Sequence, residues 1–110
     1  MTNIKIMLTR PPKTTLDDLS DKAAELVLVL KELANEKRLL ILCALLESGE
    51  CTVASLAETV DLSQSALSQH LARLRDQNMV EFRREGTTLY YKVSDRKIAL
   101  VLKNLKSLYC

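Results

Sequence analysis

The stretch from Leu62 to Arg75 constrains the fold most strongly, because its side chains divide between two faces of a helix. At 100° per residue, three leucines at i, i+4 and i+7 form one apolar stripe: Leu67, Leu71 and Leu74. The outer face carries short hydrogen-bonding side chains and arginines instead of the Glu and Lys of an ordinary solvated helix. Its members are Gln64, Ser65, Ser68, Gln69, Arg73 and Arg75. Such groups suit base edges and phosphates, so the stretch predicts a helix that reads DNA.

The start of this helix is expected at Ser63, whose hydroxyl can accept a hydrogen bond from a free amide of the first turn. An N-terminus directed into the major groove would aim unpaired amides at phosphate while Gln64 and Ser65 reach bases. Ser63 is therefore counted among the candidate DNA contacts. The alternative is an ordinary polar helix face, since serine and glutamine by themselves are weak evidence.

A second short helix precedes the reading helix. Residues Thr52 to Val60 carry an apolar stripe at i, i+3, i+4 and i+7, and Thr52 is a good N-cap. Asp61 and Leu62 then make a tight connection to Ser63. Two short helices joined by a turn of a few residues predict a helix-turn-helix, in which the second helix is the reader.

Two strand-like segments follow the reading helix. Residues 79–84 and 88–93 alternate between apolar and polar side chains, and Gly86 in the turn between them can adopt a positive φ. A β-hairpin after a helix-turn-helix is a wing. Its basic side chains could contact backbone phosphate or the adjacent minor groove, although a solvated hairpin is an equally simple interpretation. These side chains are Arg83, Arg84 and Lys92.

This order of elements resembles the ArsR/SmtB family of winged-helix bacterial repressors. The run from Leu62 to Leu71 with the following Leu74-Arg75 is similar to the family's reading helix, and Leu33 to Leu39 is similar to the entry into its second helix. The resemblance covers residues 16–109. It implies a homodimeric transcriptional regulator whose affinity for double-stranded operator DNA changes when a small inorganic signal binds or reacts.

The chain's 110 residues and net charge of +2 fit one domain and exclude a polycationic nucleic-acid coat. Residues 1–15 are expected to be a flexible N-terminal arm, since Pro11 and Pro12 break helical periodicity, and residues 16–110 the winged helix-turn-helix DNA-binding and dimerisation domain. The apolar run at 39–46 is too short to span a bilayer and no secretory signal is evident, so a cytoplasmic location is expected. The carboxylates are scattered and no phosphate loop is visible, so neither an enzyme nor a cofactor is predicted.

Three further helices are predicted, at Leu16 to Ala34, Glu36 to Glu47 and Asp95 to Tyr109. The middle one is apolar nearly all round and should be central. The first and last each carry an apolar face, which we expect a second copy to cover, although both could close over their own core. Two-fold pairing would also place two reading helices about one DNA turn apart. The predicted fold class is mainly α with a small β-hairpin, a homodimeric winged helix-turn-helix in the order α-α-α-α-β-β-α.

Metal binding is the second hypothesis for the signal. His70, the only histidine, lies toward the edge of the buried side, so a packed structural histidine is expected there rather than a ligand. Many members of the ArsR/SmtB family use a Cys-x-Cys pair before the reading helix, where this chain has Thr52 and Ala54. Another site of the family uses Asp and His on the final helix, which here has no histidine. A zinc site built from the three cysteines lacks an obvious fourth ligand, so no metal residue is assigned.

Two cysteines are the remaining candidates for signal detection. Leu39 to Cys43 and Leu105 to Cys110 resemble both halves of the thiol-based branch of the family, the BigR, SqrR and HlyU-like regulators. The resemblance implies that Cys43 and Cys110 form a dithiol sensor, which responds to reactive sulfur species or oxidants through a disulfide or longer polysulfide bridge. Otherwise Cys43 would simply be a small buried apolar residue. Cys51 is interpreted as a bystander. A third hypothesis is a winged-helix antirepressor that displaces another DNA-binding protein.

Overall fold

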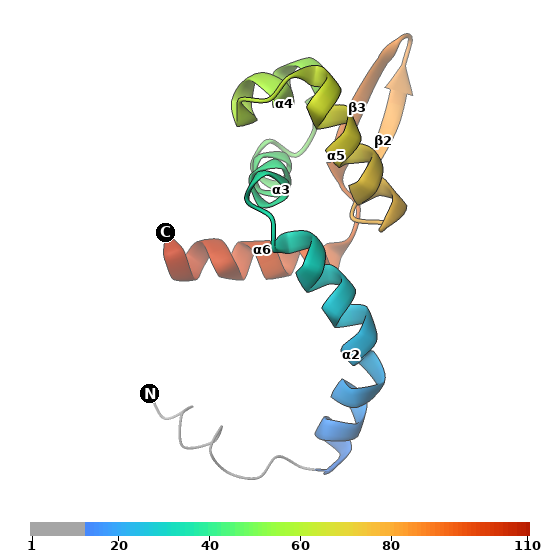
Figure 1. The fold of residues 1–110 in the computed structure, drawn as a ribbon, viewed down its shortest axis with the longest axis vertical. Helices are drawn as coiled ribbons and strands as arrows, with labels where there is room; N and C mark the ends of the chain where they lie inside the picture. The colour runs from blue at the N-terminus through green and yellow to red at the C-terminus, as the bar shows by residue number, and fades with distance from the viewer. Residues whose placement is uncertain (1–12) are drawn as a thin grey trace. The chain divides into compact units, whose positions relative to one another are not determined.

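The helices and strands follow the predicted order, with one additional strand. A computed structural model describes residues 13–110 (Figure 1). Its elements are α2 (Lys13–Leu33), α3 (Glu36–Ser48), β1 (Cys51–Thr52), α4 (Val53–Val60), α5 (Gln64–Asp76), β2 (Val80–Glu85), β3 (Thr88–Val93) and α6 (Arg96–Tyr109). The predicted arm lies outside the described residues as far as residue 12, and α2 begins at Lys13, earlier than the predicted Leu16. The predicted winged helix-turn-helix is confirmed.

The described residues divide into two compact units, 13–31 and Glu32–Cys110. In the first unit, α2 exposes a series of large apolar side chains. They are Leu16, Leu19, Leu26, Val27, Leu28 and Leu30. The second unit contains the helix-turn-helix, the sheet and α6, and it therefore holds all the candidate site residues.

The sheet has three antiparallel strands in the order β1-β3-β2. The predicted hairpin pairs Val80 with Val93 at its base and Glu85 with Thr88 at its tip, and Gly86 has the positive φ of 63° that the turn needs. The sequence analysis does not predict β1, whose two residues pair with Tyr90 and Tyr91 of β3. This short strand ties the end of α3 to the base of the wing.

The core of the second unit lies where α3, α4, α5 and α6 meet. The apolar stripes that helical periodicity predicts form this core, and the three leucines of α5 are fully buried. Burying a leucine contributes about 1.5–3 kcal/mol, so this stripe fixes which face of α5 is turned outward. The fully buried residues of the four helices include Ile41, Leu42, Leu45, Leu56, Leu67, Leu71, Leu74 and Leu102.

Side-chain caps define where the helices of the helix-turn-helix begin. The hydroxyl of Thr52 accepts from the amide of Ser55 at 3.2 Å, and that of Ser63 accepts from the amide of Ala66 at 3.1 Å, so both predicted caps are confirmed. Between the two helices Asp61 adopts a left-handed conformation with φ of 55°. An aspartate tolerates this conformation better than most side chains, and the tight turn depends on it.

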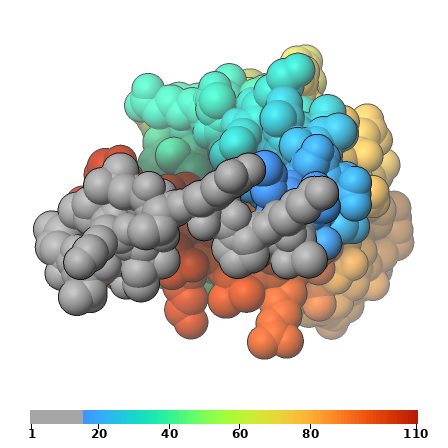
Figure 2. Space-filling model, turned by 90° about the horizontal axis from the view of Figure 1, so that it is seen from below, coloured from blue at the N-terminus to red at the C-terminus, as the bar shows by residue number. Residues whose placement is uncertain are grey.

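The last helix ends at the surface. α6 buries Ile98 and Leu102 and exposes Leu105, Leu108 and Tyr109 toward its C-terminus. Part of this helix, orange to red, is visible in Figure 2. No helix among residues 13–110 is both long enough and apolar enough to cross a bilayer.

Candidate DNA interface and thiol pair

The predicted reading side chains share one exposed surface of α5. Burial of the leucine stripe turns them outward, and the Ser63 hydroxyl keeps its role as a cap at the start of the helix. The first turn also leaves backbone amides free at its N-terminus, where an anion is favoured. The exposed members are Ser63, Gln64, Ser65, Ser68 and Gln69.

Two arginines flank this surface on opposite edges. Arg73 and Arg75 are two positions apart, which places them roughly 160° apart around the helix. The Arg75 guanidinium lies over the Phe82 ring of β2, 5.0 Å from its centroid. Arg73 instead binds Glu32 at the end of α2. Each edge of α5 is thus connected to a different part of the second unit.

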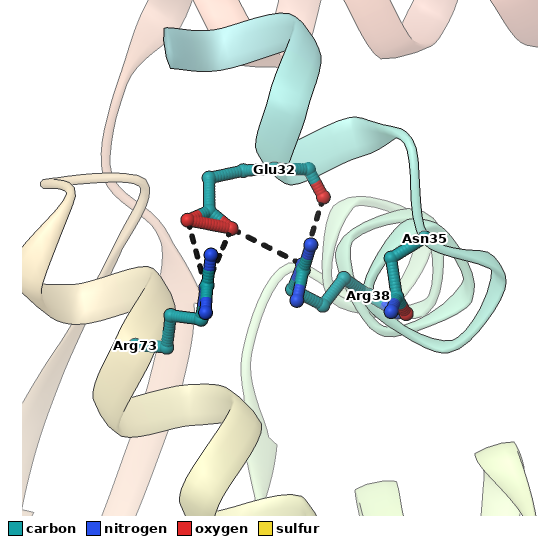
Figure 3. A network of polar contacts seen from close by, with 4 residues as sticks. All are labelled: Glu32, Asn35, Arg38 and Arg73. Atoms are coloured by element: carbon teal, nitrogen blue, oxygen red, sulfur yellow. Dashed lines mark hydrogen bonds and ion pairs between the residues drawn. The ribbon is translucent and has the colours of Figure 1, made fainter.

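Glu32 is the centre of a buried ionic network (Figure 3). Its side chain is 5% exposed, and Arg73 Nε donates to its two carboxylate oxygens at 2.9 and 3.0 Å. Arg38 Nε donates to the Glu32 carbonyl oxygen at 2.9 Å and lies 3.2 Å from the carboxylate. Asn35 caps α3 between them by accepting from the Arg38 amide at 3.1 Å. The network joins the α2–α3 corner to the outer face of α5, a connection that sequence reasoning missed.

The basic side chains of the wing differ in how many other groups they contact. Arg83 contacts both Glu50 oxygens at 2.9 and 3.0 Å and Glu85 at 2.7 Å, and its guanidinium lies 4.4 Å from the centroid of the Tyr90 ring. Hydrogen bonds that Arg83 donates to these carboxylates raise the pKa of Arg83 further above its usual range and lower the pKa of Glu50. Lys92 pairs with Glu81 at 3.4 Å. Arg84 is also exposed and, within residues 13–110, its side chain makes no hydrogen bond or ion pair, so of the predicted wing contacts it is the most available to a phosphate.

The two candidate thiols line one cavity between α3 and α6. Cys43 is half-buried on α3, and Cys110 is exposed at the C-terminal end of α6. The cavity has a volume of about 380 Å³ and is mainly apolar. Its other lining residues include Leu39, Leu40, Leu102, Leu105 and Tyr109. The fold therefore brings together two cysteines that are far apart in the sequence.

The electrostatic surroundings favour the neutral thiol of Cys43. Burial raises its pKa above 9.0, the nearby Lys106 ammonium opposes this rise, and Cys110 and Glu47 add to it. Lys106 itself lies 3.7 Å from a Glu47 oxygen. Because the thiolate is the nucleophile, Cys43 is a poor first attacker at neutral pH.

The other sequence candidates lie elsewhere. Cys51 is in β1, half-buried and paired with Tyr91 in the sheet. His70 is half-buried on α5, toward the edge of its apolar stripe. Within residues 13–110, no three His, Cys, Asp or Glu side chains are grouped as a metal site requires.

Comparison with known proteins identifies the family. Residues 35–81 match the family described as "Bacterial regulatory protein, arsR family". The chain is 43% identical over 95 residues to the transcriptional activator HlyU of Vibrio cholerae, across 86% of this chain and 87% of that protein. The chain belongs to the ArsR family. Its relatives are transcriptional regulators, not enzymes, and they include the biofilm growth-associated repressor of Xylella fastidiosa, 33% identical over 90% of this chain and 86% of that one.

A solved structure supports the same assignment for the fold. The structure entitled "Reduced HlyU from Vibrio cholerae N16961" aligns with a TM-score of 0.78 at 43% identity, over 84% of this chain and 97% of that one. The ArsR-family match at 35–81 spans α3, α4, α5 and the start of β2, so it contains the helix-turn-helix and Cys43. α6 with Cys110 lies beyond that match. The protein is thus an ArsR-family transcriptional regulator.

Proposed function

We propose that this protein is a homodimeric repressor that binds operator DNA through α5 and is switched by reactive sulfur species or oxidants at Cys43 and Cys110. The observation that carries the proposal is the shared cavity that both thiols line between α3 and α6. Its walls are mainly apolar, and the Lys106 ammonium and the Glu47 carboxylate are the charged side-chain groups that line it. One relative has a solved structure described as reduced, which fits a protein family with more than one thiol state.

The proposed reaction follows from the different exposure of the two thiols. Cys110 is exposed, so it attacks the outer sulfur of a persulfide donor R–S–SH, which gives Cys110–S–SH and the thiol R–SH. Cys43 then attacks Sγ of Cys110, and hydrogen sulfide leaves as the disulfide forms. If a second donor first lengthens this chain to Cys110–S–S–SH, attack of Cys43 on the middle sulfur gives a trisulfide, and hydrogen sulfide again leaves. An oxidant such as a peroxide would give the disulfide through a sulfenic acid.

A bridge between these thiols would affect the DNA surface through the helices packed between them. α3 packs against α4, and α4 packs against α5. Fixing α6 to α3 therefore biases the packing that presents α5. A change of about 1.4 kcal/mol in the binding-competent population alters apparent operator affinity tenfold, so a small change of packing is enough.

The switch is tested by treating the protein with a persulfide donor and measuring release of DNA and intact mass. Wild type should release DNA and form the disulfide or trisulfide, which mass distinguishes by about 32 Da per added sulfur. Cys110→Ser should remain bound and unmodified at Cys43, whereas Cys43→Ser should remain bound but accumulate a Cys110 persulfide. Cys51→Ser is the matched control and should respond as wild type does. Release of DNA from Cys110→Ser would contradict the proposal.

The reading role of α5 is tested by its sequence preference. Ser65→Ala or Gln69→Ala should lose about 1–3 kcal/mol of discrimination at one base position. Arg84→Ala should weaken binding to all duplexes alike and reduce the salt dependence by about one phosphate. Equal losses on cognate and random duplex from the α5 variants would contradict this reading face.

The homodimer rests on apolar surface that the protomer leaves exposed. α2 exposes Leu26 and Leu30, and α6 exposes Leu105 and Leu108. Patches of this kind commonly mark protein interfaces, and two-fold pairing suits paired half-sites on DNA. Analytical ultracentrifugation should give a dimer for wild type and a smaller species for Leu105→Glu. A wild-type monomer at micromolar concentration would contradict this part of the proposal.

A further inference from the structure

We propose that Glu32 is a positioning residue for DNA binding, which holds Arg73 so that its terminal amino groups meet a backbone phosphate. The inference rests on the proposed function, in which the outer face of α5 lies against DNA. It adds a carboxylate from the end of α2 to a surface otherwise formed by α5 and the wing.

Burial is the first step of the argument. Glu32 is 4% exposed, the one charged residue among the buried side chains of the described chain. Glutamate is almost never fully buried unless it is paired, and Arg38 and Arg73 supply the pairing. A carboxylate in this setting cannot turn away to water, so the arginines that bind it are held in place.

The exposure of the two arginines is the second step. Both guanidinium groups lie against the Glu32 carboxylate. Arg38 is 12% exposed and lies inside the network, whereas Arg73 is 60% exposed. Arg73 is therefore the arginine of this network that presents its positive charge at the surface.

The geometry of Arg73 is the third step. Both of its contacts to Glu32 are made by Nε, and an arginine has further donors on its two terminal amino groups. Arginine can therefore hold a buried carboxylate at one edge and donate to an anion at the other. A planar group fixed in this way loses little entropy on binding a phosphate.

The position of Arg73 on the helix is the last step. Ser65, Gln69 and Arg73 follow one another at intervals of four, so they lie along one side of α5. Ser65 and Gln69 belong to the surface that reads bases in the proposed function. Arg73, at the far end of that row, is placed to meet the backbone that borders the groove.

The test compares DNA affinity and its salt dependence for variants that remain folded by circular dichroism. The probe is a labelled random-sequence duplex of about 30 base pairs, or three helical turns. Arg73→Ala should weaken binding about tenfold, the factor of one charge-assisted hydrogen bond, and lower the slope of log K against log salt by about one. Glu32→Gln should reproduce both effects, although it removes a negative charge.

The matched control is Glu36→Gln, the same change at an exposed carboxylate on the first turn of α3. General electrostatics predict slightly tighter DNA binding for both glutamine variants. The proposal instead predicts opposite signs, with weaker binding only for Glu32→Gln. In the Arg73→Ala background, Glu32→Gln should change affinity no further.

Arg73→Lys supplies a variant that keeps the charge at an exposed position. A lysine ammonium cannot hold Glu32 and a phosphate at opposite edges, so its affinity should fall toward that of Arg73→Ala. The proposal is overturned if Glu32→Gln binds DNA as tightly as Glu36→Gln does. It is also overturned if adding Glu32→Gln to Arg73→Ala weakens DNA binding by the same factor as adding it to wild type. This inference alone fails if wild type binds the duplex and Arg84→Ala weakens that binding, but Arg73→Ala leaves it unchanged. Absence of binding by wild type rejects the proposed function itself.

Discussion

Two glutamate–arginine pairs border the candidate DNA surface, and they share a shortest contact distance but differ in the burial of the carboxylate. Arg73 binds Glu32 beside α5, and Arg83 binds Glu50 at the base of the wing, each with a shortest distance of 2.9 Å. The two arginines are similarly exposed, at 60% and 52%. Their partners are not, because the Glu32 side chain is 5% exposed and that of Glu50 is 34% exposed.

This difference in carboxylate burial separates a fixed contact from one that can adjust. Water and salt screen the Glu50 pair, and such surface pairs contribute little to stability. Glu32 has little access to water, so the arginines around it supply its polar contacts. The Glu32–Arg73 pair is therefore expected to hold α5 in position, whereas the Glu50–Arg83 pair leaves the wing adaptable.

Removing each carboxylate should show the largest contrast. Glu32→Ala takes the carboxylate away from Arg38, a side chain that is only 12% exposed, and should destabilise the fold by about 3 kcal/mol. Glu50→Ala should leave stability unchanged within error. Urea denaturation at one fixed protomer concentration measures both, since association affects apparent stability. Equal losses would remove the distinction between the two pairs.

DNA affinity should move in opposite directions for the two glutamine variants. Glu32→Gln is expected to weaken binding through Arg73, whereas Glu50→Gln frees donors of Arg83 and removes a negative charge near the wing. Glu50→Gln should therefore bind random duplex about twofold more tightly. Fluorescence anisotropy at several salt concentrations distinguishes them. Weaker binding by Glu50→Gln would mean that Arg83 also needs its carboxylate to reach DNA.

Much of this architecture could be predicted from the sequence because it depends on local periodicity. The leucine stripe of α5, the caps at Thr52 and Ser63 and the turn at Gly86 each follow from neighbouring residues. The reading surface followed from the same stripe, since burial of one face exposes the other. These parts required no knowledge of distant contacts.

The missed parts depend on partners far along the chain. β1 is two residues long, and it is a strand only because β3 lies beside it. Glu32 reads as an ordinary charged residue at the end of a helix, and its partner Arg73 is 41 positions away. The segment from Leu33 to Leu39 contains the one sequence sign of this network, because its Arg38 requires a carboxylate as partner.

Truncating each arginine gives a smaller contrast than removing the carboxylates. Arg73→Ala should cost about 1 kcal/mol of stability, because Glu32 loses two hydrogen-bond contacts while Arg38 still neutralises it. Arg83→Ala should leave the melting temperature within error, since Glu50 can turn to water. Calorimetry of both variants, again at one protomer concentration, measures the difference. An Arg83→Ala protein less stable than Arg73→Ala would reverse the ranking of the pairs.

The smallest expected effect is the pH response of the exposed pair. A hydrogen bond from Arg83 lowers the pKa of Glu50 below its ordinary value of 4.5 in the folded chain, while the unfolded chain keeps that value. The pair therefore stabilises the fold fully above pH 4.5 and loses this contribution as the pH falls through the lowered pKa. Carbon NMR of the Glu50 carboxyl should give a midpoint below 4.5 in wild type, which Arg83→Gln moves back toward it. A wild-type midpoint at 4.5 would mean that the ion pair does not persist in solution, so that only the buried pair orders an arginine.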